Sequence, residues 1–372
     1  MAPIEFVLFG MLRRMTRRGS LGRAVAVASL LATACAPQFG PAAVQNGRVA
    51  YGEALAASAD EQQLLNIVKM RFLDHATFLR VSSVTASLQF QTQGQISSNV
   101  TQTPFPLNLQ GTATWEESPT ITYQELTGSD YAQQMHSPIP AETCIALLQT
   151  WPATVLLPLV VREVNGIENV FDSIRLGDPL PVDQHGFLEV AALMEELYDR
   201  RELEWEIRAS GDAGKKVEAA MLLHTVQGKE TAESARLLEV LGLEAAKSGP
   251  TRFKIEYGLE ASAPDSISIS TRSVQGVLLF MALATDVPTD LASAALGVRP
   301  RGERLPTESL LIRSSDDKPR GSAIAIPHRG HWFYIPDEDL RSKATFRLSR
   351  ILMKMQSAEN TSGAPILTIP VN

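Results

Sequence analysis

The feature that most constrains this chain is a stretch, residues 81–115, that contains no Asp, Glu, Lys, Arg or His. Because charged residues make up 20% of the sequence, a neutral run of this length restricts what the segment can contact. Apolar and polar neutral residues alternate along it on both sides of Pro104–Pro106. A period of two is typical of strands with one apolar and one polar face. The pattern predicts a long amphipathic β-hairpin over residues 81–125.

The surroundings of this hairpin have three interpretations. Strands that cross an outer membrane need about nine to eleven residues, and one hairpin alone leaves unpaired edges in lipid, so insertion requires several subunits that share a closed sheet. Alternatively, the hairpin packs on its own domain or on a partner, or it is a flexible insertion rich in Gln, Ser and Thr. The residues predicted to contact a membrane or a neighbouring subunit are Val84, Leu88, Phe90, Leu107, Leu109 and Trp115.

The N-terminus has the pattern of a secretory signal peptide. Five arginines between residues 13 and 23 precede an apolar segment of eleven residues, 24–34, which is too short to span a bilayer as a mature helix. Leu31-Ala32-Thr33-Ala34-Cys35 resembles the lipobox of bacterial lipoproteins, although Leu is usual where Ala32 stands. The resemblance implies cleavage before Cys35, diacylation of its thiol and acylation of the new amine. An ordinary secretory signal with an incidental Cys35 is the alternative.

The residue after Cys35 is Ala36 rather than Asp, which in lipoproteins of two-membrane bacteria implies sorting to the outer membrane. Several acyl chains on one cysteine anchor a protein stably. We therefore expect a lipid-anchored protein on the periplasmic face of the outer membrane, with the membrane as a partner through acylated Cys35. Residues 1–34 carry a net charge of +4, so the total of −7 becomes −11 after cleavage, which argues against nucleic acid as a partner. Translation can start at Met1 or Met11.

Composition and periodicity divide the chain into a signal peptide (1–34), a tether (35–57), a helical region (58–178) with the inserted hairpin, and a second domain (187–372). The tether is rich in Ala, Pro, Gly and Gln, and the boundary before residue 187 is rich in Pro and Gly. The second domain alternates helical patterns with half-buried strands of antiparallel type. The predicted fold class is α+β, with a mostly antiparallel sheet in the second domain.

Several stretches of the mature chain resemble a family of uncharacterised bacterial lipoproteins or secreted proteins. They are LLNIVKMRF, FLRVSSVTAS, SPTITYQELTGSDY, RGHWFYIPDEDLRSKATFRL and APILTIPV. The resemblance implies no activity, cofactor or catalytic residue. Around His331 and Pro336 the family tends to have Tyr and Asp, so these two residues are given no role.

No residue set predicts catalysis, a cofactor or a metal site. The two residues of His328-x-x-His331 face opposite sides of a strand, with no carboxylate spaced to complete a metal shell. Residues 337–339 are acids where the first turn of a helix favours them. Ser315-x-x-Lys318 lies in a turn, whereas the nucleophile motif that it matches opens a helix. Cys144 is predicted to be a buried, inert thiol.

Four cations form a stripe on the last predicted helix: Lys343, Arg347, Arg350 and Lys354. They can contact anionic headgroups or an acidic partner, whereas a solvated helix face is the simpler interpretation. Taken together, the sequence predicts a cell-envelope protein that acts by binding or assembly, with a homo-oligomer or another envelope protein as its partner. The hairpin then forms or lines an outer-membrane pore. A periplasmic hydrolase with its site in 187–372 is the alternative, and carboxylates or His clustered in a deep pocket would favour it.

Overall fold

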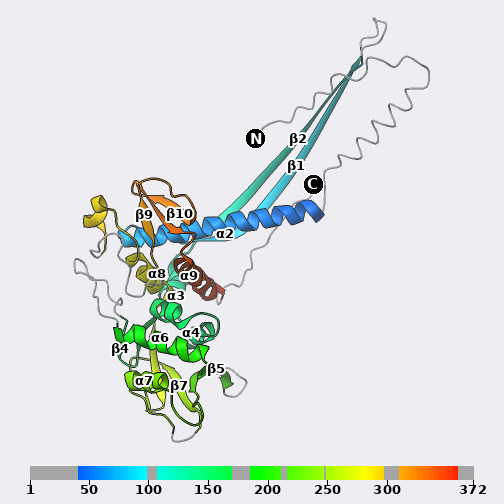
Figure 1. Cartoon of the computed structure of the whole chain (residues 1–372). Coiled ribbons are helices and arrows are strands. Elements are labelled where there is room, and N and C mark those ends of the chain that lie inside the picture. The colour runs from blue at the N-terminus through cyan, green and yellow to red at the C-terminus, as the bar shows by residue number, and fades with distance from the viewer. Residues whose placement is uncertain are drawn as a thin grey trace. The chain divides into compact units, whose positions relative to one another are not determined.

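The α+β class is confirmed in the structure, a computed structural model (Figure 1). The described elements belong to two compact units, which we treat separately: one holds residues 41–56 and 79–124, and the other holds residues 57–78 and those from 125 onwards. The structure describes residues 41–98, 107–169, 185–210, 216–246, 249–296 and 310–358.

Helix α2 (Pro41–Arg71) runs through most of the segment that was predicted to be a tether. Its first half is rich in Ala, the residue with the highest helix propensity, and Pro41 stands at the first position, where a missing N–H costs little. A helix start at residue 58 is therefore wrong, since that residue lies inside α2. In the second unit, Leu64 and Ile67 of α2 are fully buried.

Strands β1 (Leu79–Ser98) and β2 (Leu107–Glu125) form a two-stranded sheet (Figure 1). The sequence of residues 119–123 predicts a short strand of its own, whereas in the structure this segment is the last part of β2. Residues 99–106, and the side chains of residue 80 and of residues 82–119, lie outside what the structure describes. The structure thus shows that the two strands are neighbours in one sheet, and it does not describe the contacts of these side chains.

The second unit is built on a six-stranded mixed sheet. All neighbouring strands are antiparallel except β7 and β8, which are parallel, so the predicted mostly antiparallel sheet is present. Strand β8 is buried along its whole length, whereas β7 alternates between buried and exposed residues. In spatial order the strands are β4 (Ile167–Glu168), β3 (Val161–Val164), β8 (Ser266–Thr271), β7 (Thr251–Tyr257), β6 (Lys216–Leu223) and β5 (Leu203–Ser210).

Strands β3 and β4 replace the end of a predicted helix. The sequence pattern suggests one helix up to Val164, but α5 (Ala153–Val160) ends earlier and the chain continues as β3. Asn165 and Gly166 have φ angles of 46° and 80°, which suit the two-residue hairpin turn that Asn-Gly favours. Asn-Gly is therefore a hairpin turn here and not a helix stop. Through β3, elements from before and after the predicted boundary at 178–187 share one sheet.

Helices pack on this sheet and on one another. Helix α4 (Ala141–Leu148) contacts β5, β6, β7 and β8, and α6 (His185–Asp199) contacts α5, β5 and α7 (Ala232–Leu241). The remaining helices contact one another around α5 and α9, and their side chains join one continuous core. They are α3 (Gly128–His136), α8 (Val274–Leu283) and α9 (Leu340–Ala358).

A three-stranded antiparallel sheet follows, in the order β10 (Ser322–His328), β11 (His331–Pro336) and β9 (Arg313–Ser315). The predicted strands on either side of His328-Arg329-Gly330 are confirmed as β10 and β11. The helix predicted after them is confirmed as α9, and Asp339 caps it by accepting the backbone N–H of Ser342 at 3.1 Å. The predicted core stripe of α9 is wrong at its ends, because Leu340 is 73% and Met355 41% exposed.

The buried side chain of Arg272 joins β8 to the end of α5. Its guanidinium Nη1 donates to the carbonyl oxygens of Pro158, Leu159 and Val161 at 2.8, 3.2 and 3.1 Å. The guanidinium also lies over the Phe280 ring, 4.7 Å from its centre. Carbonyls at a helix C-terminus lack partners within the helix, and Arg272 supplies donors there together with the Asn169 amide, which donates to the carbonyls of Pro158 and Val161 at 2.9 and 2.7 Å.

Candidate functional site

The described residues enclose a pocket of about 250 Å³ where the loop between α4 and α5 meets the last turn of α6 and strand β5. Leu148, Met194 and Trp205 are buried and line its inner part. Tyr198 and Asp199 are exposed and line its rim. We call this cavity the α6 pocket. It lies wholly within the second unit.

The α6 pocket combines aromatic rings with carboxylates. Trp151, Tyr198 and Trp205 supply the rings, and Glu195 and Asp199 supply the two carboxylates. No Lys, Arg or His stands among the residues that line it. Aromatic faces and carboxylates both attract cations, so the lining favours a positively charged group over an anion.

Three hydrogen bonds hold part of this lining in place. The carboxylate Oε2 of Glu195 accepts the backbone N–H of Thr154 at 2.8 Å and the Thr154 hydroxyl at 2.5 Å, so Glu195 satisfies the first turn of α5. The Tyr198 hydroxyl donates to the carbonyl of Gln149 at 3.3 Å. The helix and the loop between α4 and α5 are thereby joined across the pocket.

Local sequence explains how these side chains come together. Glu195, Tyr198 and Asp199 are spaced three and four residues apart, which places them on one face of α6. Pro152 stands just before α5 and makes the preceding loop short. Trp205 shares its face of β5 with Leu203, because alternate strand residues point the same way, and both are buried. The acid–aromatic spacing in residues 195–199 was a usable signal, but the sequence-based search for catalytic and metal sets did not select it.

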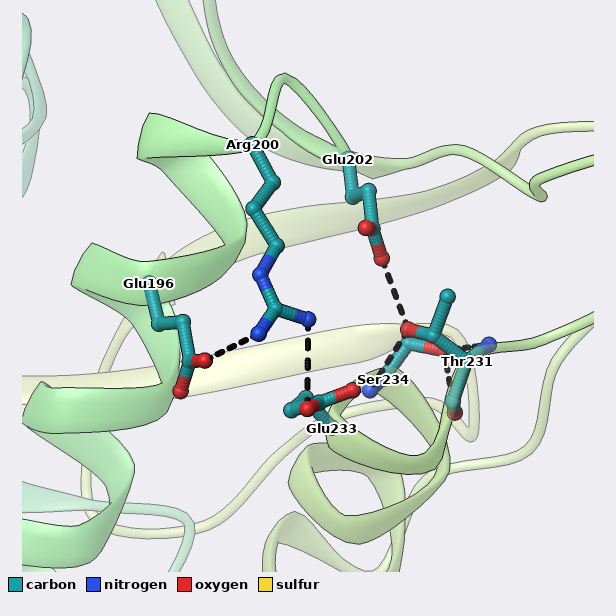
Figure 2. A network of polar contacts seen from close by, with 6 residues as sticks. All are labelled: Glu196, Arg200, Glu202, Thr231, Glu233 and Ser234. Carbon is teal, nitrogen blue, oxygen red and sulfur yellow. Dashed lines mark hydrogen bonds and ion pairs between the residues drawn. The ribbon is translucent and has the colours of Figure 1, made fainter.

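A polar network fixes the chain immediately after the pocket rim (Figure 2). Arg200 follows α6, forms an ion pair with Glu233 at 3.1 Å and also contacts Glu196 one turn earlier. The Thr231 hydroxyl donates to Glu202 Oε2 at 2.7 Å, and Thr231 forms a capping box with Ser234 at the start of α7. The network therefore holds the end of α6 against the start of α7.

Electrostatics in this network favour its charged forms. The pKa of Glu233 lies below its ordinary value, first because the carboxylate accepts a hydrogen bond from the Glu233 backbone amide and then because it pairs with Arg200. The pKa of Arg200 is raised by Glu233 first and by Glu196 as well. Arg200, the nearest cation along the chain to Asp199, is thus engaged with acids that do not line the pocket.

The residues predicted to contact a membrane or a subunit lie on the two paired strands. Val84, Leu88 and Phe90 are on β1, and Leu107, Leu109 and Trp115 are on β2. Their side chains are outside what the structure describes, and so are Cys35 and residues 1–34, which were predicted to be a signal peptide. The contacts predicted for these residues stay predictions.

Cys144 lies on α4 and is fully buried. Burial raises the pKa of its thiol to about 12, because a thiolate is poorly stabilised in an apolar interior. The thiol is therefore protonated at neutral pH and a poor nucleophile, as the prediction of an inert residue requires.

The four cations predicted to form a stripe on α9 do not have equal surroundings. Lys343 donates to the Asp337 carboxylate at 2.6 Å, and Arg350 forms an ion pair with Asp60 at 2.8 Å. Arg347 and Lys354 are exposed. Half of the stripe is thus engaged within the second unit, which weakens the case for a basic contact surface.

The two histidines His328 and His331 contact separate acids. His328 Nε2 lies 2.9 Å from Asp74 Oδ2, and the two ring nitrogens of His331 each lie 3.0 Å from a carboxylate oxygen, one of Asp290 and one of Asp316. Because these carboxylates sit at opposite edges of the ring, they form a hydrogen-bonded chain. Within the described ranges, no group of three or more His, Cys, Asp or Glu side chains is arranged to hold a metal ion.

Comparison of the chain with family models, curated proteins and solved structures found no match. None of the described helices has the length and apolar character needed to cross a membrane.

Proposed function

We propose that this chain is a lipid-anchored protein on the periplasmic face of the outer membrane and that it acts by binding or assembly through the hairpin of β1 and β2. The observation that carries the proposal is the pairing of two strands of 20 and 19 residues, which include most of an uncharged, alternating sequence. In this proposal the hairpin is an amphipathic insertion in a helical region, and its apolar face meets lipid or another subunit.

The length of the strands supports a contact beyond the chain itself. At about 3.3 Å per residue, strands of this size extend roughly 60–65 Å, well beyond what one membrane crossing needs. A two-stranded hairpin is at best marginally stable in water, and its outer edges have unpaired N–H and C=O groups. Strands from further copies of the chain would pair with those edges. A homo-oligomer that forms or lines an outer-membrane pore would pair the strand edges and would also give the long hairpin a membrane to cross.

The N-terminal sequence supports the location. The lipobox-like LATAC ending at Cys35, with Ala36 after it, would hold every copy at one membrane and so raise the local concentration of hairpins. The resemblance to uncharacterised bacterial lipoproteins agrees with this placement and adds no activity.

A periplasmic hydrolase with its site in 187–372 ranks second. The α6 pocket does contain two carboxylates from that segment, Glu195 and Asp199. However, Glu195 already accepts two hydrogen bonds that hold the first turn of α5. A carboxylate with a structural task of this kind is a weaker candidate for general acid or base catalysis than one that faces the pocket unpaired.

The assembly proposal is tested by replacing residues 85–114 with a short Gly-Ser linker and sizing the detergent-extracted protein. The deletion is expected to reduce the particle to a monomer. A finer pair of variants changes one face of the hairpin at a time. The first variant changes the apolar face to Thr at Leu88, Phe90, Leu107 and Leu109. The matched control changes the polar face to Thr at Gln89, Gln91, Asn108 and Gln110. Only the first set should dissociate the oligomer. If the deletion variant keeps both its size and its membrane partition, the proposal is wrong.

The anchor has a separate test. Cys35→Ser removes the thiol that would be acylated, so the protein should move from the membrane fraction to the soluble fraction. Cys144→Ser is the control, because the buried thiol of α4 should have no effect on partition. Membrane retention of Cys35→Ser in a chain that also lacks residues 85–114 would contradict the lipobox interpretation.

A further inference from the structure

We propose that the α6 pocket binds an aliphatic ammonium group, such as the side chain of a lysine in a peptide or a small primary amine. This function is separate from the anchor and from the hairpin, because every lining residue belongs to the second unit.

The first argument is the chemistry of the lining. An ammonium group gains from the faces of aromatic rings and from nearby carboxylates, and Trp151, Tyr198 and Trp205 stand with Glu195 and Asp199 around one cavity. An anion would meet two carboxylates and no cation there. The lining therefore discriminates by charge.

The second argument is that no described cation already occupies the pocket. Arg200 is turned to Glu196 and Glu233, and no described residue forms an ion pair with Asp199. Glu195 uses Oε2 for Thr154, so its hydrogen bonds leave Oε1 available to a ligand. A ligand cation would supply the missing positive charge.

The third argument is size and access. Pockets that enclose drug-sized ligands measure about 300–1,000 Å³, so a cavity of about 250 Å³ suits one side chain or a small amine. Its inner wall of Leu148, Met194 and Trp205 is apolar and would accept the methylene chain, while Asp199 at the exposed rim would lie near the solvent. A ligand with an aliphatic chain and a terminal ammonium group would place its chain against the apolar wall and its charge near Asp199.

The test is a titration of the full chain followed by the indole N–H signals in NMR. The chain has four tryptophans, so Trp151→Phe and Trp205→Phe identify the two pocket signals. The probes are Nα-acetyl-lysine amide, its uncharged counterpart Nα-acetyl-norleucine amide, glycerophosphoethanolamine and N-acetylglucosamine. We expect the lysine probe to shift the Trp151 and Trp205 signals in a saturable way and the norleucine probe to bind at least about fivefold more weakly, since one charge–aromatic or charge–carboxylate contact is worth about 1 kcal/mol.

Two variants separate a charge effect from a loss of fold. Asp199→Asn keeps the shape of an exposed side chain and should weaken the lysine probe about fivefold. Glu204→Gln removes the same charge from an exposed residue of β5 outside the pocket and should leave affinity unchanged. A stronger response to glycerophosphoethanolamine than to the lysine probe would assign the ammonium group to a lipid headgroup. Equal binding of the lysine and norleucine probes, preference for the sugar, or no shift of either indole would overturn the proposal.

Discussion

The two-stranded sheet of β1 and β2 and the six-stranded sheet of the second unit gain their partners in different ways. Strands β1 and β2 follow each other in the chain and pair only with one another among the described strands. The six-stranded sheet pairs strands that are distant in sequence, as β3 does with β8. It buries β8 on both faces, whereas a hairpin alone has no second layer. The comparison teaches that one sheet is completed within its unit, while the other needs a contact that its own two strands do not supply.

The largest expected effect is a loss of stability that one substitution causes in the second unit and that the matching substitution in β1 does not cause. Phe253 of β7 is fully buried, so Phe253→Ala should lower the free energy of unfolding of the second unit by about 3–5 kcal/mol, because it removes a large side chain and leaves a cavity. Phe90→Ala makes the same change in β1, which belongs to the other unit, and should leave this transition unchanged. Urea denaturation followed by circular dichroism measures both. Equal destabilisation by the two variants would show that the units unfold as one and would break the comparison.

The same contrast explains what the sequence could predict. Strands with regular alternation were found: Leu203, Trp205 and Ile207 in β5, and Phe253, Ile255 and Tyr257 in β7. Strand β6 was missed because KVEAAMLL has apolar residues in succession and therefore no period of two. Strand β3 was missed because its VREV continues the apolar run of α5, so that only the turn at Asn165-Gly166 marks the change.

The candidate site was harder to predict for a related reason. The α6 pocket combines a loop, the last turn of a helix and one strand residue, at positions 148–153, 194–199 and 205. Each segment was assigned locally, but only tertiary packing brings them together. Arg272 illustrates the same limit, because nothing near it in sequence predicts that a cation is buried against three carbonyl groups of α5 and β3.

The next largest effect concerns this buried arginine, which helps to complete the second unit. Arg272→Met keeps much of the side-chain length but removes its donors to the carbonyls of Pro158, Leu159 and Val161. The Asn169 amide still donates to the carbonyls of Pro158 and Val161, so the loss falls mainly on Leu159. Because a buried carbonyl without a donor is costly, we expect a loss of about 1–3 kcal/mol in the free energy of unfolding. Chemical denaturation measures it, with exposed Arg347→Met as the control. A loss below that of the control would mean that water replaces the guanidinium.

A smaller effect should depend on pH, and it tests a polar link between His331 and two exposed acids of the second unit. Hydrogen bonding to Asp290 first, and to Asp316, raises the pKa of His331 above 6.5, and the same contact with His331 lowers the pKa of Asp290 below 3.8. The histidine contribution is complete below pH 6.5 and is lost as pH rises through the raised pKa. The aspartate contribution is complete above pH 3.8 and is lost as pH falls through the lowered pKa. The stabilisation should therefore be greatest between these two values.

His331→Gln tests this pH dependence, since glutamine can donate a hydrogen bond but cannot titrate. The difference in melting temperature between the parent and the variant should be largest near pH 5 and should shrink at alkaline pH. It should stay below the effect of Arg272→Met, because Asp290 and Asp316 are 65% and 84% exposed and solvent screens the pair. His224→Gln, at a residue whose nearest acid is a more distant 3.5 Å, is the control. A pH-independent difference would rule out titration of His331 as its cause.

The smallest effect tests whether surface charge matters to a sheet at all. Glu206 of β5 and Arg252 of β7 form an ion pair at 2.8 Å across β6, where Ala220 stands opposite Glu206 and leaves room. Glu alternates along β5 and Arg or Lys along β7, so the sequence indicates that the two faces could meet if the strands were neighbours, and the pair forms although β6 lies between them. A double-mutant cycle with Glu206→Gln and Arg252→Gln should give a coupling of only about 0.2–1 kcal/mol, since Arg208 also contacts Glu206 and solvent screens the two arginines, which are 37% and 66% exposed. If the coupling is that small, charges add little to the stability of the six-stranded sheet, and stability alone does not explain why β1 and β2 carry none over residues 81–98 and 107–115. A coupling of several kcal/mol would instead mean that charge pairs contribute strongly to sheet stability. The uncharged hairpin would then lack that contribution, which would favour the interpretation that it is a flexible insertion.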